Sequence, residues 1–418
     1  MDKTIIDSYP RYDSYKDSGV DWLGEIPEGW RTEKGKWLFN KMDRPIRKDD
    51  GIVTCFRDGE VTLRSNRRTD GFTNALKEHG YQGIRKGDLV IHQMDAFAGA
   101  IGVSDSEGKS TPVYSVCVPK EPDQISPYYY MYFMRSMALR GFILSLAKGI
   151  RERSTDFRYS DFAKLELPLP PYNTQVKISK FIETKTTQID QAITLKQQQI
   201  AKLEEYKQIV IQNAVTKGLN PDAPMKDSGV DWIGNIPMHW EIKKLKFLCR
   251  FDTGNKDTVN AVDGGKYPLF VRSDNIESIN EYTHECEAVM TSGDGAGVGK
   301  IYHYYNGKFC FHQRVYMFNR FNKVTGKFFY NYFSSLFINV ALDGSAKSTV
   351  DSLRRSKIAN FWFAVPPKTE QEQIVSHIDS FNASFDKILM SYKTQIDRLK
   401  EYKAILINQA VTGKIKVS

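Results

Sequence analysis

The chain has 418 residues, 41% of them hydrophobic and 12% aromatic, which is typical of folded proteins with more than one core. No apolar run approaches the ~20 residues of a membrane span, and no apolar signal core follows Met1. We therefore expect a cytoplasmic protein of two to four domains. The net charge of +9 favours a polyanionic partner, of which nucleic acid is the commonest.

The cysteines and histidines argue against a metal site. The five cysteines are scattered without a CxxC pair, and the seven histidines show no HExxH or other close metal spacing. We expect buried free thiols and no metal bound by this chain.

Two segments of the chain recur later in it. Lys16–Trp30 returns as Lys226–Trp240 with eleven of fifteen positions identical, and Leu203–Thr216 returns as Leu399–Thr412 with nine of fourteen identical. The order of the two landmarks is preserved. The chain is therefore predicted to contain two copies of one unit.

The stretches between the landmarks differ between the copies. They run from Lys36 to Pro168 and from Lys246 to Val365, and both contain short runs of Val, Ile, Phe and Tyr bounded by Gly, Asp and Asn. Such runs predict strands and turns, and aromatic residues at helical spacing predict helices over 127–146 and 325–342. Each stretch is expected to form a small mixed α/β domain.

A long amphipathic helix is predicted to follow each domain. Pro170-Pro171 and Pro366-Pro367 end the preceding strand, and Asn173, Thr174 and Thr369 are candidate N-caps. Apolar residues then recur at 3 and 4 spacing until Gly218 and Gly413, as in a coiled-coil seam: Ile182, Ile189, Ile193, Ile200, Leu203, Val210 and Ala214, with Ile378, Phe385, Leu389, Ile396, Leu399, Leu406 and Ala410 in the second copy.

The predicted fold class is α+β, with two mixed α/β domains separated by two long antiparallel coiled-coil helices in a circular pseudo-two-fold repeat. The expected boundaries are 1–170 and 219–366 for the domains, and 171–218 and 367–418 for the spacer helices.

In combination and in duplicate, these features resemble the specificity subunit of a type I restriction–modification enzyme. The resemblance covers essentially the whole chain. It depends on DSGVDWxGxIPxxW at the start of each copy, on LPLPPYNTQ and FAVPPKTEQEQI before the helices, and on LxEYKxxxIxxAVT at the helix ends.

The resemblance implies a non-catalytic, sequence-specific DNA-binding subunit. Each target-recognition domain would read one half of an asymmetric bipartite target in double-stranded DNA. The helices would set the spacer between the half-sites and dock two methyltransferase subunits, and motor–nuclease subunits would join them. This chain would bind no cofactor, whereas its partners would use S-adenosylmethionine, ATP and Mg.

Candidate DNA contacts are the Arg, Lys, Asn, Gln and His residues in polar loops, because cations bind phosphate and Arg, Asn and Gln read base edges. A solvated basic loop is the alternative for each of them. We expect Arg64–Arg68 to correspond to Arg272–Asn275. The candidates are Arg64, Asn66, Arg67, Arg68, Lys109, Arg151 and Arg153 in the first domain, and Arg272, Asn275, His312, Gln313, Arg314 and Lys347 in the second.

The sequence gives little support to an enzymatic role. The stretch Gly293–Lys300 resembles a P-loop, but Asp294 stands where that motif needs Gly and Ile301 where it needs Ser or Thr, so a glycine-rich turn between strands is expected. No Asn/Asp-Pro-Pro-aromatic motif of an amino-methyltransferase occurs, since Leu169 precedes Pro170. A coiled-coil scaffold that binds only protein remains the alternative to DNA recognition.

Overall fold

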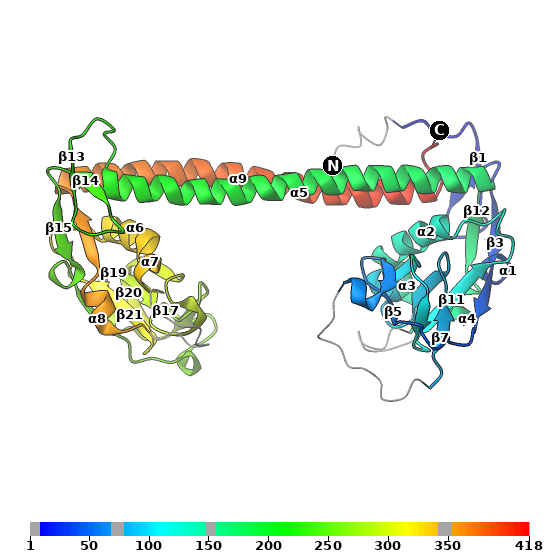
Figure 1. The fold of residues 1–418 in the computed structure, drawn as a ribbon, viewed down its shortest axis with the longest axis horizontal. Coiled ribbons are helices and arrows are strands. Elements are labelled where there is room, and N and C mark those ends of the chain that lie inside the picture. Colours follow the sequence, from blue (N-terminus) through cyan, green and yellow to red (C-terminus); the bar gives the residue numbers. More distant parts are fainter. Residues whose placement is uncertain (1–8, 68–78, 147–155, 342–352, 418) are drawn as a thin grey trace. The chain divides into compact units, whose positions relative to one another are not determined.

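The computed structural model describes residues 9–67, 79–146, 156–341 and 353–417, and it separates into two compact units. Unit 1 is Met1–Leu195 with Thr394–Ser418, and unit 2 is Lys196–Lys393. Each unit contains small sheets, short helices and one part of each long helix, α5 (Tyr172–Lys217) and α9 (Lys368–Val411) (Figure 1).

Unit 1 has a central four-stranded sheet and several two-stranded ones. The central order is β4-β11-β8-β9, and all its pairs are antiparallel. Its strands are β4 (Phe39–Met42), β8 (Leu89–His92), β9 (Ile101–Val103) and β11 (Tyr114–Pro119). The two-stranded sheets pair β1 (Tyr15–Asp17) with β2 (Glu25–Pro27), β3 (Arg31–Lys34) with β12 (Glu166–Leu169), β5 (Val53–Cys55) with β6 (Val61–Leu63), and β7 (Gln82–Ile84) with β10 (Gly108–Ser110).

Helix α2 (Pro127–Leu139) buries an aromatic face in the core of unit 1. Tyr129, Tyr130 and Phe133 are almost fully buried, and the Tyr130 hydroxyl donates to the Pro168 carbonyl at 3.0 Å. The single helix expected over 127–146 is wrong, because Gly141 takes a positive φ of 84° and separates α2 from α3 (Phe142–Leu146). The other short helices are α1 (Gly35–Leu38), α4 (Tyr159–Phe162) and the 3₁₀ turns η1 (Arg64–Asn66) and η2 (Ala96–Ala98).

Unit 2 repeats this order in a larger sheet. Its six strands run β16-β21-β19-β20-β17-β18, in which the first four correspond to the central sheet of unit 1 and β17-β18 to the hairpin β5-β6. They are β16 (Arg250–Thr253), β17 (Tyr267–Phe270), β18 (Ile276–Ile279), β19 (His284–Ser292), β20 (Tyr302–Phe311) and β21 (Val315–Asn319). The smaller sheets pair β13 (Met225–Asp227) with β14 (Asn235–Pro237) and β15 (Glu241–Lys244) with β22 (Trp362–Val365).

The helices of unit 2 match those of unit 1. Thr325 caps α6 (Gly326–Leu336) through its side chain, which accepts from the Phe328 N–H at 3.3 Å. The helix expected over 325–342 also ends early, and α7 (Ile338–Ala341) follows it. The remaining elements are α8 (Arg355–Ala359) and the 3₁₀ turns η3 (Leu245–Phe247), η4 (Thr258–Asn260) and η5 (Gly295–Gly297).

The repeated DSGVDW motif forms a hairpin whose apolar residues enter the core. In unit 1 the hairpin is β1-β2, and Trp30 after it is 2% exposed and packs edge-on against Tyr129. In unit 2 the hairpin is β13-β14, and Trp240 is 1% exposed. The buried residues among those that carry the resemblance therefore stabilise the fold.

A buried glutamine holds the start of each long helix. The side chain of Gln175 accepts from the Ser126 N–H at 2.9 Å and donates to the Gln124 and Pro170 carbonyls. Gln371 repeats the arrangement in unit 2 with Thr325, Lys323 and Pro366. The candidate caps Asn173, Thr174 and Thr369 instead lie inside the first helical turn.

Within each unit, α5 and α9 pack along their apolar faces. In unit 2, Lys196 lies over the Tyr392 ring and Lys207 pairs with Asp386, so the two helices run in opposite directions there. In unit 1, Ile182 and Ile189 share a core with Leu406 and Ala410. No helix among the described residues is long and apolar enough to cross a membrane.

The cysteines occupy the interior of both units. All five are free thiols; Cys55, Cys117, Cys249 and Cys310 are buried, and Cys286 is half-buried. Burial raises the pKa of the Cys55, Cys117 and Cys249 thiols well above its ordinary value, so these groups stay neutral.

Candidate nucleic-acid interface

An aspartate in the glycine-rich turn of unit 2 holds two arginines. The Asp294 carboxylate accepts from Arg272 at 2.8 Å and from Arg314 at 2.9 Å. Asp294 lies two residues after β19, Arg272 lies two residues after β17 and Arg314 directly precedes β21, so the sheet brings together three distant parts of the sequence. The arginine side chains stay 41% and 58% exposed while the carboxylate is largely covered.

The charge state of this group follows from its contacts. Burial tends to raise the pKa of Asp294, but the hydrogen bonds and positive charges of Arg272 and Arg314 outweigh it and hold that pKa below its ordinary value. The carboxylate is ionised at neutral pH, and it fixes both guanidinium groups in a charge-assisted geometry.

Unit 1 contains the same arrangement in a simpler form. Asp95 lies in the turn after β8, and its carboxylate accepts from Arg57 at 2.8 Å. The neighbouring His92 ring accepts from the Asp95 N–H at 3.0 Å through Nδ1. Burial lowers the pKa of His92, although the Asp95 carboxylate opposes this, and a neutral ring is what this acceptor role requires.

The expected correspondence between Arg64–Arg68 and Arg272–Asn275 is wrong by one strand, β6. Arg57 follows β5 and binds the aspartate of the glycine-rich turn, as Arg272 follows β17 and does the same. The counterpart of Arg272 is therefore Arg57, which was missed, and not Arg64. The run Thr-Cys-Phe before Arg57 resembles Leu-Phe-Val before Arg272, but Val-Thr-Leu before Arg64 does so equally, so the local sequence does not distinguish the two arginines.

The Arg64–Arg67 turn lies after the hairpin β5-β6. Arg64 donates to the Thr54 hydroxyl at 3.3 Å, and Asn66 donates to the Thr62 hydroxyl at 2.8 Å. Arg67 stacks over the Phe56 ring and pairs with Asp58 at 2.6 Å. These side chains are tied to their own domain, which limits the conformations in which they could meet a ligand.

The other predicted contacts are dispersed. Lys109 lies in β10, and Asn275 is exposed beside the turn that leads to β18. Gln313 is exposed and donates to Asp257 at 2.7 Å. His312 is 2% exposed, and its Nδ1 accepts from the Arg314 N–H at 2.9 Å. Its ring therefore orders the turn that carries Gln313 and Arg314, which are the parts of this turn that a ligand can reach.

Four predicted contacts lie outside the described residues: Arg68, Arg151, Arg153 and Lys347. From the predicted set, the structure brings Arg272 and Arg314 together on the Asp294 carboxylate. In unit 1, it identifies a further arginine, Arg57, on the Asp95 carboxylate.

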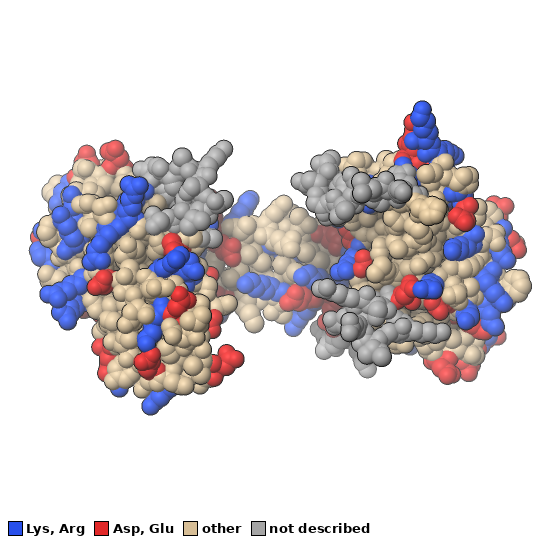
Figure 2. Space-filling view, turned by 90° about the horizontal axis from the view of Figure 1, so that it is seen from below, with Lys and Arg blue, Asp and Glu red and all other residues tan. Residues whose placement is uncertain are grey.

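The arrangement suits recognition and not catalysis. The stretch Gly293–Lys300 forms η5 between β19 and β20, which confirms a turn between strands in place of a P-loop. Lysine and arginine side chains gather on one flank of each unit (Figure 2). An exposed guanidinium fixed by a carboxylate retains free N–H donors, and it can present them to a guanine edge or a phosphate.

The comparisons with known proteins agree on one family. A family model described as the type I restriction modification DNA specificity domain matches residues 237–398. The EcoDI specificity subunit of a type I restriction enzyme from Escherichia coli is 25% identical over 182 residues, which cover 44% of this chain and 40% of that protein. The StySPI specificity subunit from Salmonella potsdam is 21% identical, over 94% of this chain and 90% of that protein.

A solved structure extends the similarity to the fold. A chain from a structural study of complex assembly and conformational transition in the type I R-M system superimposes with a TM-score of 0.67 at 14% identity, covering 92% of this chain and 98% of that one. The chain thus matches less than half the length of the Escherichia coli relative but nearly all of the Salmonella one. Both relatives are named as specificity subunits, which agrees with the expectation of a chain without catalysis. In its sequence matches and its fold, the chain is therefore similar to the specificity subunits of type I restriction–modification enzymes.

Proposed function

We propose that this chain directs a type I methyltransferase and its associated motor–nuclease to one asymmetric bipartite DNA sequence. Each unit reads one half-site, and the chain performs no chemistry itself. The observation that carries the proposal is the repeated placement of an exposed arginine on the aspartate of the glycine-rich turn, Arg57 on Asp95 and Arg272 on Asp294.

The two sites share an arginine bound by an aspartate, but the polar residues beside that aspartate differ between the units. Unit 2 adds a second guanidinium from Arg314, whereas Asp95 in unit 1 has a neutral His92 beside it. A common scaffold with different polar neighbours is what two readers of unlike sequences require, because base identity is distinguished by the donor and acceptor pattern. The half-sites are therefore expected to differ.

The long helices support the spacer role. At ~1.5 Å per residue, the 46 residues of α5 correspond to ~69 Å, or about two turns of a DNA duplex at ~34 Å each. The apolar seams would form an antiparallel coiled coil, and the circular repeat would present two equivalent surfaces. Two methyltransferase subunits would dock there, with motor–nuclease subunits completing the complex.

The cofactors belong to those partners. The methyltransferase would use S-adenosylmethionine and the motor would use ATP with Mg. This chain would determine only the DNA sequence on which they act.

Methylated adenines mapped genome-wide, in cells expressing the methyltransferase subunit with and without this chain, test the proposal. Modification is expected at one bipartite sequence with unlike halves, and only when the chain is present. Methylation that is independent of the chain contradicts the proposal. Gel-shift binding by the reconstituted complex that ignores DNA sequence would favour the scaffold alternative.

A further inference from the structure

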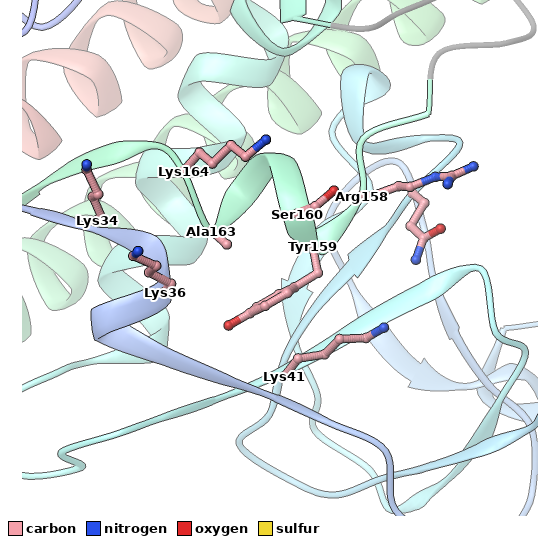
Figure 3. Close-up of a pocket in the computed structure, with 9 residues that line it drawn as sticks. Lys34, Lys36, Lys41, Arg158, Tyr159, Ser160, Ala163 and Lys164 are labelled. Carbon is pink, nitrogen blue, oxygen red and sulfur yellow. The ribbon is translucent and has the colours of Figure 1, made fainter.

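Five basic side chains surround an open hollow of about 590 Å³ in unit 1. Lys34 and Lys36 come from the β3–α1 segment, Lys41 from β4, and Arg158 and Lys164 flank α4 (Figure 3). All five are exposed, and the sites proposed above for base reading do not include them.

The acidic groups near this hollow leave an excess of positive charge. Glu166 lies 3.9 Å from Lys34, and Asp156 pairs with Arg158 at 2.6 Å. Among the described residues, these two acidic groups face five cations, so the surface of the hollow is basic. Tyr159 lines the same hollow and donates its hydroxyl to the Phe39 carbonyl at 2.9 Å, which fixes one wall.

The repeat shows which of these cations recur. Lys34 and Lys36 stand four and six residues after Trp30, and Lys244 and Lys246 stand four and six residues after Trp240. Arg158 and Arg354 each precede the Pro-Pro pair by twelve residues.

The strand register agrees with this alignment. Lys34 pairs with Glu166 across β3-β12, and Lys244 pairs with Trp362 at the matching position of β15-β22. In unit 2, Arg355 and Lys357 on α8 follow Arg354, but Arg355 pairs with Asp252 at 3.4 Å and Lys357 donates to the Val340 and Ala341 carbonyls.

Burial does not explain why these cations recur, although Lys36 and Lys246 each lie over the aromatic ring that follows them, Trp37 and Phe247. Lys36, Lys246, Arg158 and Arg354 are exposed, and each could be replaced by another polar residue without loss of buried surface. The two units meet different bases, so a feature common to both should face something that is the same at both half-sites. The sugar–phosphate backbone is such a partner, and its charge is complementary.

We infer that Lys34, Lys36 and Arg158 in unit 1, with Lys244, Lys246 and Arg354 in unit 2, form two equivalent phosphate-binding patches that position each unit on duplex DNA without reading bases. The inference rests on the DNA-recognition role proposed above, to which it adds a sequence-independent site.

The test uses the full chain in complex with its methyltransferase subunits. Affinity for a cognate duplex and for a scrambled duplex of equal length is measured by fluorescence anisotropy over a series of salt concentrations. The variants are Lys36→Ala/Arg158→Ala, Lys246→Ala/Arg354→Ala and the combination of all four. The charge-matched control removes four exposed lysines outside the proposed patches and the long helices: Lys48, Lys86, Lys226 and Lys327.

Each two-residue variant is expected to lower the slope of log affinity against log salt by ~2, about one per lost phosphate contact. Binding at ~0.1 M salt should weaken at least tenfold for both duplexes alike, because phosphate contacts carry no sequence information. The ratio of cognate to scrambled affinity should stay within about twofold of wild type, and the control should keep the wild-type slope.

Two results would overturn the inference. One is an unchanged slope and affinity in the combined variant. The other is loss of methyltransferase subunits from the purified variant, which would make the patch a protein-docking surface. In that case the double variant Trp37→Ala/Phe247→Ala should lose the same subunits, because these exposed aromatic residues lie beside the patches. If the wild-type complex itself fails to distinguish the two duplexes, the proposed function fails instead, so the two failures are distinguishable.

Discussion

The side-chain carbonyl of Gln175 accepts a hydrogen bond from the backbone N–H of Ser126 at 2.9 Å, although 49 residues separate them in the sequence. The contact joins the first turn of α5 to the residue before α2, and the Gln175 side chain that makes it is fully buried. Gln371 and Thr325 repeat it in unit 2 at 2.8 Å. Each long helix is thereby anchored to the domain that precedes it.

Replacing this glutamine should destabilise its unit. Gln175→Leu leaves the Ser126 N–H and the Gln124 and Pro170 carbonyls without their partner in a buried site, at a cost of about 2–4 kcal/mol in the free energy of unfolding. Denaturant unfolding measures this value. Gln188→Leu, at an exposed position of the same helix, should change stability by less than about 0.5 kcal/mol and is the control. Equal effects of the two variants would contradict the anchoring role.

The ion pair between the helices should matter much less. Lys403 donates to both carboxylate oxygens of Asp190, at 2.8 and 2.6 Å, and the corresponding residues Lys207 and Asp386 pair at 3.5 Å. The Lys403 and Asp190 side chains are 31% and 55% exposed. A double-mutant cycle with Lys403→Ala and Asp190→Ala should therefore give a coupling below about 1 kcal/mol that falls with added salt. A larger coupling that resists salt would show a desolvated pair.

Removing the shared carboxylate of unit 2 should impair one half-site. Asp294→Ala frees the Arg272 and Arg314 guanidinium groups, so discrimination against single-base mismatches in the half-site read by unit 2 should fall by about 1–3 kcal/mol. Competition binding with mismatched duplexes measures this. Glu277→Ala removes the same charge from an exposed position of β18 and should leave discrimination unchanged. Equal loss at both half-sites would contradict independent reading.

Exchanging one variable region should change one half-site. Replacing residues 36–168 with the equivalent segment of another family member should alter the half-site read by unit 1 and preserve the other, since the Arg57–Asp95 site lies wholly within the exchanged segment. Adenine-methylation mapping gives the answer. The reciprocal exchange of residues 246–365 is the control, and a change in both half-sites after either exchange would refute modular reading.

Lengthening both helices should lengthen the gap between the half-sites. One heptad added to α5 and to α9 extends each by ~10 Å, close to three base pairs at ~3.4 Å each. Methylation mapping should then show both half-sites with a longer unread gap. An insertion in one helix alone should disturb the pairing of Lys207 with Asp386 and reduce assembly. An unchanged gap after the double insertion would show that the helices do not set the spacing.

The sequence by itself determined the duplicated unit, the positions of both long helices and the presence of short strands in both variable regions. The reason is local: the 3–4 spacing of apolar residues and the prolines before each helix act over neighbouring residues, and α5 and α9 lie where that pattern predicts them. Local signals also had limits, since they missed the positive φ of Gly141 that ends α2.

Only the tertiary structure decided which polar groups meet. Arg272, Asp294 and Arg314 come from three segments that the order β21-β19-β20-β17 brings together, and Gln175 reaches Ser126 only because α2 packs against the start of α5. Hydrophobic periodicity specifies which face of an element is buried, but it does not specify which distant loops lie beside it. The partner of each arginine therefore depends on strand order and register, which a single sequence leaves open.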